Sequence, residues 1–252
     1  DPVLTPNQPL LNRIREYGEE VKYTFDATDV LLSVLPQELD HVMEINLNGL
    51  RIGDHGMVAL SKASEYLISL EDLDVGGNLI GDRGMIAFSE ACQSGRFPKL
   101  KTLNLYYNTI GEEGMEEFSS AIINGHSDVY PSFGSRLTIL NLGFNRIGDA
   151  GMISFTHVIT PSLGKESRLP LLAELNLCQN QIRDDGMKQF SDAMTHGALP
   201  RLRSLSIYGN YVSPILYPDI ANLVSARGDV TVDRWRAENG IAAQARYEEI
   251  SA

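Results

Sequence analysis

The sequence predicts a single right-handed, curved α/β solenoid, with parallel strands on the concave face and α-helices on the convex face. A strand-like motif with the spacing L-x-x-L-x-L-x-x-N-x-L recurs along residues 42–213. A helix-like block, such as IGDRGMIAF at 80–88, begins at the last aliphatic residue of five of these copies. One strand and one helix cannot bury their apolar faces alone, so we expect successive copies to stack.

The strand motif occurs five times with only aliphatic substitutions, and a sixth time with Leu50 in place of the asparagine. Alternation with a period of two, as in LNL at 103–105, sends two aliphatic side chains inward and the middle one outward. The asparagine is expected to begin a turn and to bond backbone groups that stacking would leave unpaired. The copies end at Ile52, Ile80, Ile110, Ile147, Ile182 and Val212, a series that chance does not produce.

The helix block contains an acidic residue where each helix is expected to begin, as an N-cap or as negative charge in the first turn. A methionine and the Leu or Phe three residues later form an apolar stripe. We therefore expect the methionines in the core rather than in a metal site. The acidic row is Asp54, Asp82, Glu112, Asp149 and Asp184, and the methionine row is Met57, Met85, Met115, Met152 and Met187.

On these motifs the chain resembles leucine-rich repeat proteins, and most closely the ribonuclease-inhibitor-like subfamily, whose long repeats alternate a strand with an α-helix. The resemblance covers about residues 42–213. The motifs identify the fold with high specificity but give almost no information about activity.

We expect one domain over 1–252, in which 1–41 is an N-terminal cap with a degenerate repeat. Six strand-turn units follow over 42–213, and 214–252 supplies the last helix and a C-terminal cap. The caps are needed because an open apolar end of a solenoid invites aggregation. They are predicted as strands at 21–25 and 230–232 and helices at 10–20, 27–39, 218–226 and 236–250.

The composition narrows the class of partner. The formal net charge is −12, from 33 acidic and 21 basic residues. Nucleic acids and anionic membranes need Lys and Arg to neutralise phosphate, so neither is expected as the main partner, and a protein with a basic surface is favoured. No apolar run is long enough for membrane insertion. The two cysteines and the lack of an Asn-X-Ser/Thr acceptor favour an intracellular, cytoplasmic location.

Motifs for chemistry are missing from the sequence. It contains no phosphate-cradling loop with lysine, no G-x-S-x-G segment and no histidine pair with metal-ligand spacing. Cys92 and Cys178 lie three repeats apart and are expected to be unpaired. Cys178 directly follows an inward leucine, so we expect it on the sheet surface, exposed and without a catalytic histidine. The sequence therefore predicts a protein that is not an enzyme and holds no cofactor or metal.

The outward residues of the strands are the predicted partner-binding surface. Small polar residues are also expected on this face without any partner. Neighbouring strands lie only about 4.8 Å apart, so the inner curve is crowded and small polar side chains merely keep it solvated. Tyrosines beside carboxylates favour a protein partner over that explanation. The predicted binding residues are Asp72, Asp74, Asn104, Tyr106, Asn141, Glu174, Asn176 and Tyr208.

Two longer loops, at 124–136 and 160–170, predict a second surface. Stacking would place them side by side on one rim, which is locally basic, although tolerated insertions explain them equally well. The rim residues are Tyr130, Phe133, Arg136 and Arg168.

The predicted function is a non-catalytic scaffold for protein–protein interaction: an adaptor, a regulatory module or a subunit of a larger assembly. The alternative is a GTPase-activating protein that resembles the Ran GTPase-activating family, which is also acidic and built of such repeats. No catalytic motif of that family matches here, so no residue is assigned to that role. The sequence does not determine the oligomeric state.

Overall fold

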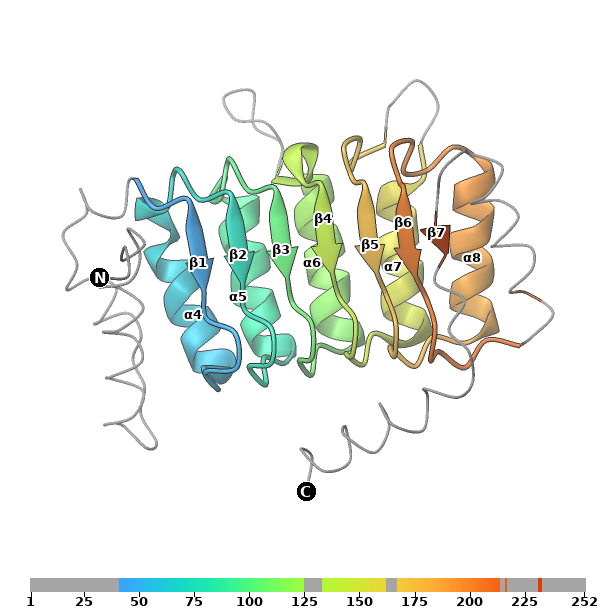
Figure 1. The fold of residues 1–252 in the computed structure, drawn as a ribbon, viewed down its shortest axis with the longest axis horizontal. Coiled ribbons are helices and arrows are strands. Elements are labelled where there is room, and N and C mark those ends of the chain that lie inside the picture. The colour runs from blue at the N-terminus through green and yellow to red at the C-terminus, as the bar shows by residue number, and fades with distance from the viewer. Residues whose placement is uncertain (1–40, 125–132, 162–166, 214–215, 217–230, 233–252) are drawn as a thin grey trace, which may run out of the picture.

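The computed structural model describes residues 41–124, 133–161, 167–213, 216 and 231–232. Its strands form one parallel sheet in the order β1-β2-β3-β4-β5-β6-β7. Figure 1 shows the strands side by side on one face of the molecule, with helices α4 to α8 behind them. The predicted α/β repeat solenoid is therefore confirmed.

Strands and helices alternate as the motifs predict. The helices have 11 to 13 residues, and none in the described part of the chain is long and apolar enough to cross a bilayer. The elements are β1 (Glu44–Asn46), α4 (Gly53–Ala63), η1 (Ser64–Tyr66), β2 (Asp72–Asp74), α5 (Asp82–Gln93), β3 (Thr102–Asn104), α6 (Glu112–Asn124), η2 (Phe133–Arg136), β4 (Ile139–Asn141), α7 (Gly148–Ile159), β5 (Glu174–Asn176), α8 (Asp184–Thr195), β6 (Ser204–Ser206) and β7 (Thr231–Val232).

The predicted end strand at 230–232 is present, because β7 pairs in parallel with β6. The other predicted cap elements, which fall within 1–40, 217–230 and 233–252, lie outside the described residues.

The core lies between the sheet and the helices. The register aligns the central residue of each strand with its equivalent in the next, so Leu73 pairs with Leu103 and Leu103 with Leu140, all fully buried. The five repeated methionines have no exposed surface, which confirms the prediction that they are core residues. Phe88 and Phe118 in α5 and α6 stack with their ring centroids 6.4 Å apart. Each repeat thus packs on its own equivalent.

A ladder of asparagines connects the turns that follow the strands. Asn108 Nδ2 donates hydrogen bonds to the carbonyl of Val75 in the preceding repeat, at 3.1 Å, and to that of Leu105 in its own, at 3.0 Å. Its Oδ1 accepts from the amides of Asn78, at 3.1 Å, and Ile80, at 2.9 Å. One buried side chain therefore satisfies backbone groups of two repeats. The ladder consists of Asn78, Asn108, Asn145, Asn180 and Asn210.

The acidic row stabilises the helix of the following repeat. Its members lie in the first helical turn, as predicted. The prediction that they cap their own helices was wrong, because Asp82 Oδ1 accepts from Gly111 N, at 2.6 Å, and Gly114 N, at 3.0 Å, one repeat further on. Asp54 and Asp149 make both equivalent bonds, and Asp184 accepts the first of them, from Ser213 N at 2.6 Å. These acceptors satisfy amides that a helix N-terminus leaves unpaired.

This contact explains the glycine in the helix block. A Cβ atom on Gly114 would lie 2.7 Å from Asp82 Oδ1 and 3.1 Å from Asp82 Cα. Any larger residue would push the preceding helix away. The block therefore contains glycine for close approach between helices.

The repeat that begins at Gly148 departs from this pattern. The preceding repeat supplies Glu112 instead of an aspartate, and the Gly148 amide bonds the carbonyl of Asn180, at 2.9 Å. Gly148 has φ +62°, as Gly53 does at φ +58°, whereas the aspartate-bonded Gly81 is extended at φ −106°. Where the preceding repeat supplies Glu112 in place of an aspartate, the backbone therefore has a different conformation at the start of α7.

We predict that Glu112→Asp stabilises the protein. The shorter side chain can make the two bonds that Asp82 makes, which is worth about 1 kcal/mol in the free energy of unfolding. Equilibrium unfolding in urea measures the change, and Glu113→Asp, which shortens the exposed neighbouring glutamate, is the matched control. No gain, or an equal gain in the control, would show that the bonds to the next helix are not what selects aspartate.

Candidate protein-binding face

Three outward positions per repeat form a continuous surface, which we call the sheet face: the first and third residues of each strand and the residue two positions after it. The parallel register places equivalent positions on neighbouring strands side by side. All eight predicted binding residues lie on this surface. Glu174 is exposed, and Asp72, Asp74, Asn104, Tyr106, Asn141, Asn176 and Tyr208 are half-buried.

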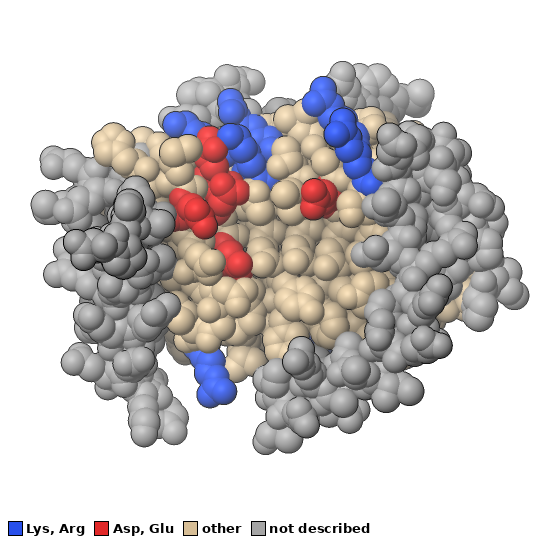
Figure 2. Space-filling model, in the orientation of Figure 1, with Lys and Arg blue, Asp and Glu red and all other residues tan. Residues whose placement is uncertain are grey.

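The sheet face is acidic over β1 and β2. Glu44 pairs in register with Asp72, so the two carboxylates lie on adjacent strands, and Asp74 follows on the same side of the sheet. Figure 2 shows these acidic residues gathered over the first strands. Asp74 Oδ1 accepts from the amide of Gly76, at 2.9 Å, and from Asn48 Nδ2, at 3.2 Å. Within the described residues, Asp72 and Asp74 make no salt bridge.

An aromatic cluster follows over the ends of β3 and β4. The ring centroid of Tyr106 is 5.1 Å from that of Phe144 and 6.1 Å from that of Tyr107, and the Tyr107 and Phe144 rings are 5.9 Å apart. Tyr106 is half-buried, and burial raises the pKa of its hydroxyl, with smaller contributions from Cys178 and Tyr107. Phe144 is buried, whereas Tyr106 and Tyr107 are both half-buried, so these two are the rings of the cluster that a partner can reach.

The central polar residues have a structural role as well. Asn104 Oδ1 accepts from the amide of Tyr106, at 3.0 Å, and Asn141 Oδ1 accepts from that of Gly143, at 3.2 Å. Asn176 bonds the amide of Cys178 in the same way, at 3.0 Å. Their oxygens hold the chain as it leaves each strand, so a partner would meet mainly their Nδ2 groups.

Cys178 is buried, so the prediction that it is exposed was wrong. Its neighbour in the row is Gly143, and a Cβ on that glycine would lie 2.8 Å from Cys178 Sγ. The thiol fills the space that Gly143 leaves open, and the Tyr208 hydroxyl hydrogen-bonds it from the other side. Both cysteines are free, which confirms that they are unpaired.

Only some of the predicted rim residues lie on the surface of the described structure. Tyr130 lies outside the described residues, Arg136 is exposed and Arg168 is half-buried. The prediction that Phe133 lies on the surface was wrong, because its ring packs edge-on against Phe88 and Phe118, each at 5.8 Å. The apolar position that holds Phe97 in the preceding repeat is occupied by glycine here, and Phe133 fills the core in its place.

Three segments of the chain, 66–89, 98–119 and 136–155, match the leucine-rich repeat family. Each segment covers one strand and the first turns of the helix that follows it. The chain therefore contains leucine-rich repeats, and its fold is a leucine-rich repeat solenoid. The ribonuclease-inhibitor-like subfamily stays a prediction.

Solved structures similar to the chain include actin-binding site 2 of leiomodin-1 and an internalin from Listeria monocytogenes. The leiomodin-1 structure has a TM-score of 0.44 and 13% identity, over 98% of this chain and 97% of that one. The internalin has a TM-score of 0.36 and 14% identity, over 80% of this chain and 63% of that one. No curated protein sequence matches the chain.

The residue before each ladder asparagine has a left-handed backbone, whatever its type. It is glycine at Gly77 and Gly209, and it is Tyr107, Phe144 and Gln179, with φ of +55°, +56° and +53°, in the three repeats between them. Residues with a side chain are strained by about 1–2 kcal/mol each in this region. The strain therefore belongs to the repeated turn and not to the aromatic cluster alone. Sequence reasoning missed this feature, although glycine at two of these equivalent positions was a signal for it.

We predict that alkaline pH destabilises this leucine-rich repeat solenoid through its buried thiols. Burial raises the pKa of Cys92 well above the ordinary 9.0, and raises that of Cys178. Above about pH 9 the unfolded chain loses these protons while the folded protein keeps them, so the free energy of unfolding falls as pH rises. Urea unfolding from about pH 8 to about pH 10 measures this slope. A Cys92→Ser/Cys178→Ser variant should have a shallower slope than the parent, and identical slopes would contradict the account.

Proposed function

We propose that the sheet face binds a protein partner, and that this partner presents a basic segment to strands β1 to β3. The observation that carries the proposal is the pair Asp72 and Asp74, two carboxylates of β2 on the sheet face that make no salt bridge within the described residues. A lysine or arginine from a partner would pair with these carboxylates, so this part of the sheet face favours a cation.

The aromatic cluster supports the same partner. Asp74 is in register with Asn104, and Tyr106 follows two residues later on the same face. An arginine that pairs with Asp74 would therefore lie beside the Tyr106 ring, where a cation–π contact adds to the ion pair. Tyrosine also supplies apolar area and a polar hydroxyl, which is why it is enriched in protein interfaces.

The rigidity of the sheet lowers the cost of binding. The strand ends are fixed by the asparagine ladder and by the bonds of Asp74, Asn104 and Asn141 to the chain that follows. A surface that is ordered before association loses little conformational entropy when the partner docks. Solenoids present extended surfaces of this kind to their partners.

In this proposal the protein acts by binding and not by catalysis, as an adaptor, a regulatory module or a subunit of a larger assembly. The GTPase-activating alternative stays a prediction. It is tested by the rate of GTP hydrolysis by small GTPases with and without the protein.

We predict that a short fluorescein-labelled peptide of alternating arginine and leucine binds the sheet face. Tyr106→Ala should weaken binding about tenfold or more, as loss of a central interface aromatic does, whereas Tyr106→Phe keeps the ring and most of the affinity. Asp72→Lys should also weaken binding, and added salt should shrink its effect. Fluorescence anisotropy measures the affinities.

Glu116→Lys is the matched charge control, because Glu116 is exposed on α6 and away from the sheet. It should leave the affinity nearly unchanged. Equal losses in Asp72→Lys and Glu116→Lys would mean that the peptide responds only to the overall negative charge, and the proposed face would then be wrong.

A further inference from the structure

The edge at which the strands begin is basic, although the chain as a whole has a net charge of −12. Lys101 and Arg203 directly precede β3 and β6, and Arg136 ends η2 just before β4. Figure 2 shows the basic side chains along one edge of the molecule, with acidic residues below them toward the strands. The basic residues of this edge are Lys99, Lys101, Arg136, Arg168, Arg201 and Arg203.

Most of these cations have no acidic partner among the described residues. Lys101 Nζ is 2.6 Å from Glu71 Oε2, which is an ion pair. Arg136, Arg168, Arg201 and Arg203, which we call the arginine edge, make no salt bridge within the described part of the chain. Backbone bonds connect the strand starts, since the amides of Arg203 and Ser204 both bond the carbonyl of Ala173.

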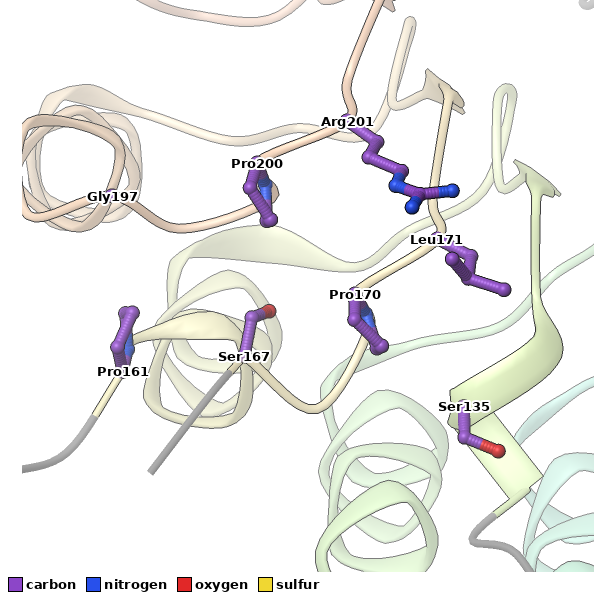
Figure 3. A pocket seen from close by; sticks show the side chains of 8 residues that line it. All are labelled: Ser135, Pro161, Ser167, Pro170, Leu171, Gly197, Pro200 and Arg201. Carbon is purple, nitrogen blue, oxygen red and sulfur yellow. The ribbon is translucent and has the colours of Figure 1, made fainter. Parts of the chain in front are cut away.

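A pocket of about 570 Å³ opens beside the arginine edge. Its walls include Pro161, Pro170, Pro200 and Leu171 together with Ser135 and Ser167, and Arg201 is the one charged residue among the described residues that line it. Figure 3 shows the three prolines on separate stretches of chain, with the Arg201 side chain extending toward the Leu171 side. The volume is in the range of about 300–1000 Å³ that is typical of ligand sites, and mainly apolar walls with a few polar groups are their usual chemistry.

The pocket and the arginines belong to one packed unit. A Cβ atom on Gly134, two residues before Arg136, would lie 3.0 Å from the carbonyl oxygen of Arg168 and 2.7 Å from a methyl carbon of Leu169. The turn that contains η2 is therefore in contact with the segment that supplies Arg168 and Pro170. Ser135 and Ser167, the residues directly before Arg136 and Arg168, line the pocket, so both arginines belong to turns that border it.

We propose that the pocket and the arginine edge bind a short acidic protein segment, with an apolar side chain in the pocket and carboxylates on the arginines. Arginine pairs with carboxylates through two parallel hydrogen bonds, which gives this edge a preference for Asp and Glu. The inference goes beyond the proposed function, because the partner has the opposite charge and docks at the edge of the sheet.

A single-stranded nucleic acid fits the site less well. Such ligands stack their bases on aromatic side chains, and none of the residues that line this pocket is aromatic. Polyanion binding is therefore an outcome for the experiment to exclude.

The test uses three fluorescein-labelled probes: a short peptide of alternating glutamate and leucine, a glutamate–serine peptide of equal length, and an oligouridylate. The glutamate–leucine peptide should bind, and the glutamate–serine peptide should bind at least tenfold more weakly because nothing fills the pocket. Arg168→Glu/Arg201→Glu should weaken the glutamate–leucine peptide at least tenfold. Lys62→Glu/Lys188→Glu, a double reversal of the same size at exposed sites on α4 and α8, should have no such effect.

Arg136→Glu, at an exposed position, gives a second variant should the double reversal fail to fold, and circular dichroism checks both. The proposal is overturned if the glutamate–leucine peptide does not bind, if it binds the arginine variants as it binds the parent, or if the two peptides bind equally. Tighter binding of the oligouridylate would also overturn it, in favour of a general polyanion surface. Variants of Tyr106 and Asp72 should not change this binding. Failure of this proposal can therefore be distinguished from failure of the proposal for the sheet face.

Discussion

The buried asparagine ladder is the interaction on which the rest of the molecule depends. Each turn after a strand carries backbone amides and carbonyls away from water, where an unpaired polar group costs about 1–3 kcal/mol. Asn145 shows how the ladder satisfies them: its Nδ2 donates to Leu105 and Leu142, and its Oδ1 accepts from Ile110. Because two of these partners belong to the preceding repeat, no repeat is complete without its neighbour. The aspartates of the helices repeat this logic on the other side of the core.

This dependence between repeats separates stability from binding. The side chains that hold the repeats together point inward or along the turns, so the outward positions are free to vary in chemistry. Over β1 and β2 they are acidic, over β3 and β4 they are aromatic, and along the strand starts they are basic. The left-handed backbones of Tyr107 and Phe144 lie in the turns of the ladder, which is rigid enough to maintain them.

The sequence was sufficient for everything that depends on the repeat period. Strand positions, the inward leucines, the methionine core and the outward position of Tyr106 follow from spacing alone. Contacts between repeats were harder to predict, because helix-capping rules consider one helix at a time, whereas Asp82 bonds the helix of the next repeat. Phe133 and Cys178 were placed wrongly because each is buried next to a glycine that replaces a larger residue. Phe133 precedes Gly134, which stands where the preceding repeat has the core residue Phe97, and Cys178 fills the space that Gly143 leaves open on the adjacent strand. Comparison of equivalent repeat positions, where those glycines replace larger residues, was the available signal.

Equilibrium urea unfolding of Asn145→Ala tests the central role of the ladder most directly. The substitution leaves the Ile110 amide and the Leu105 carbonyl without the Asn145 side chain, so the account predicts a loss on the order of 3 kcal/mol or more in the free energy of unfolding. Asn141→Ala removes an asparagine of the same repeat that bonds only the local amide of Gly143, and should cost about 1 kcal/mol. Equal losses in the two variants would contradict the account, because the bonds between repeats would then contribute no more than a local turn.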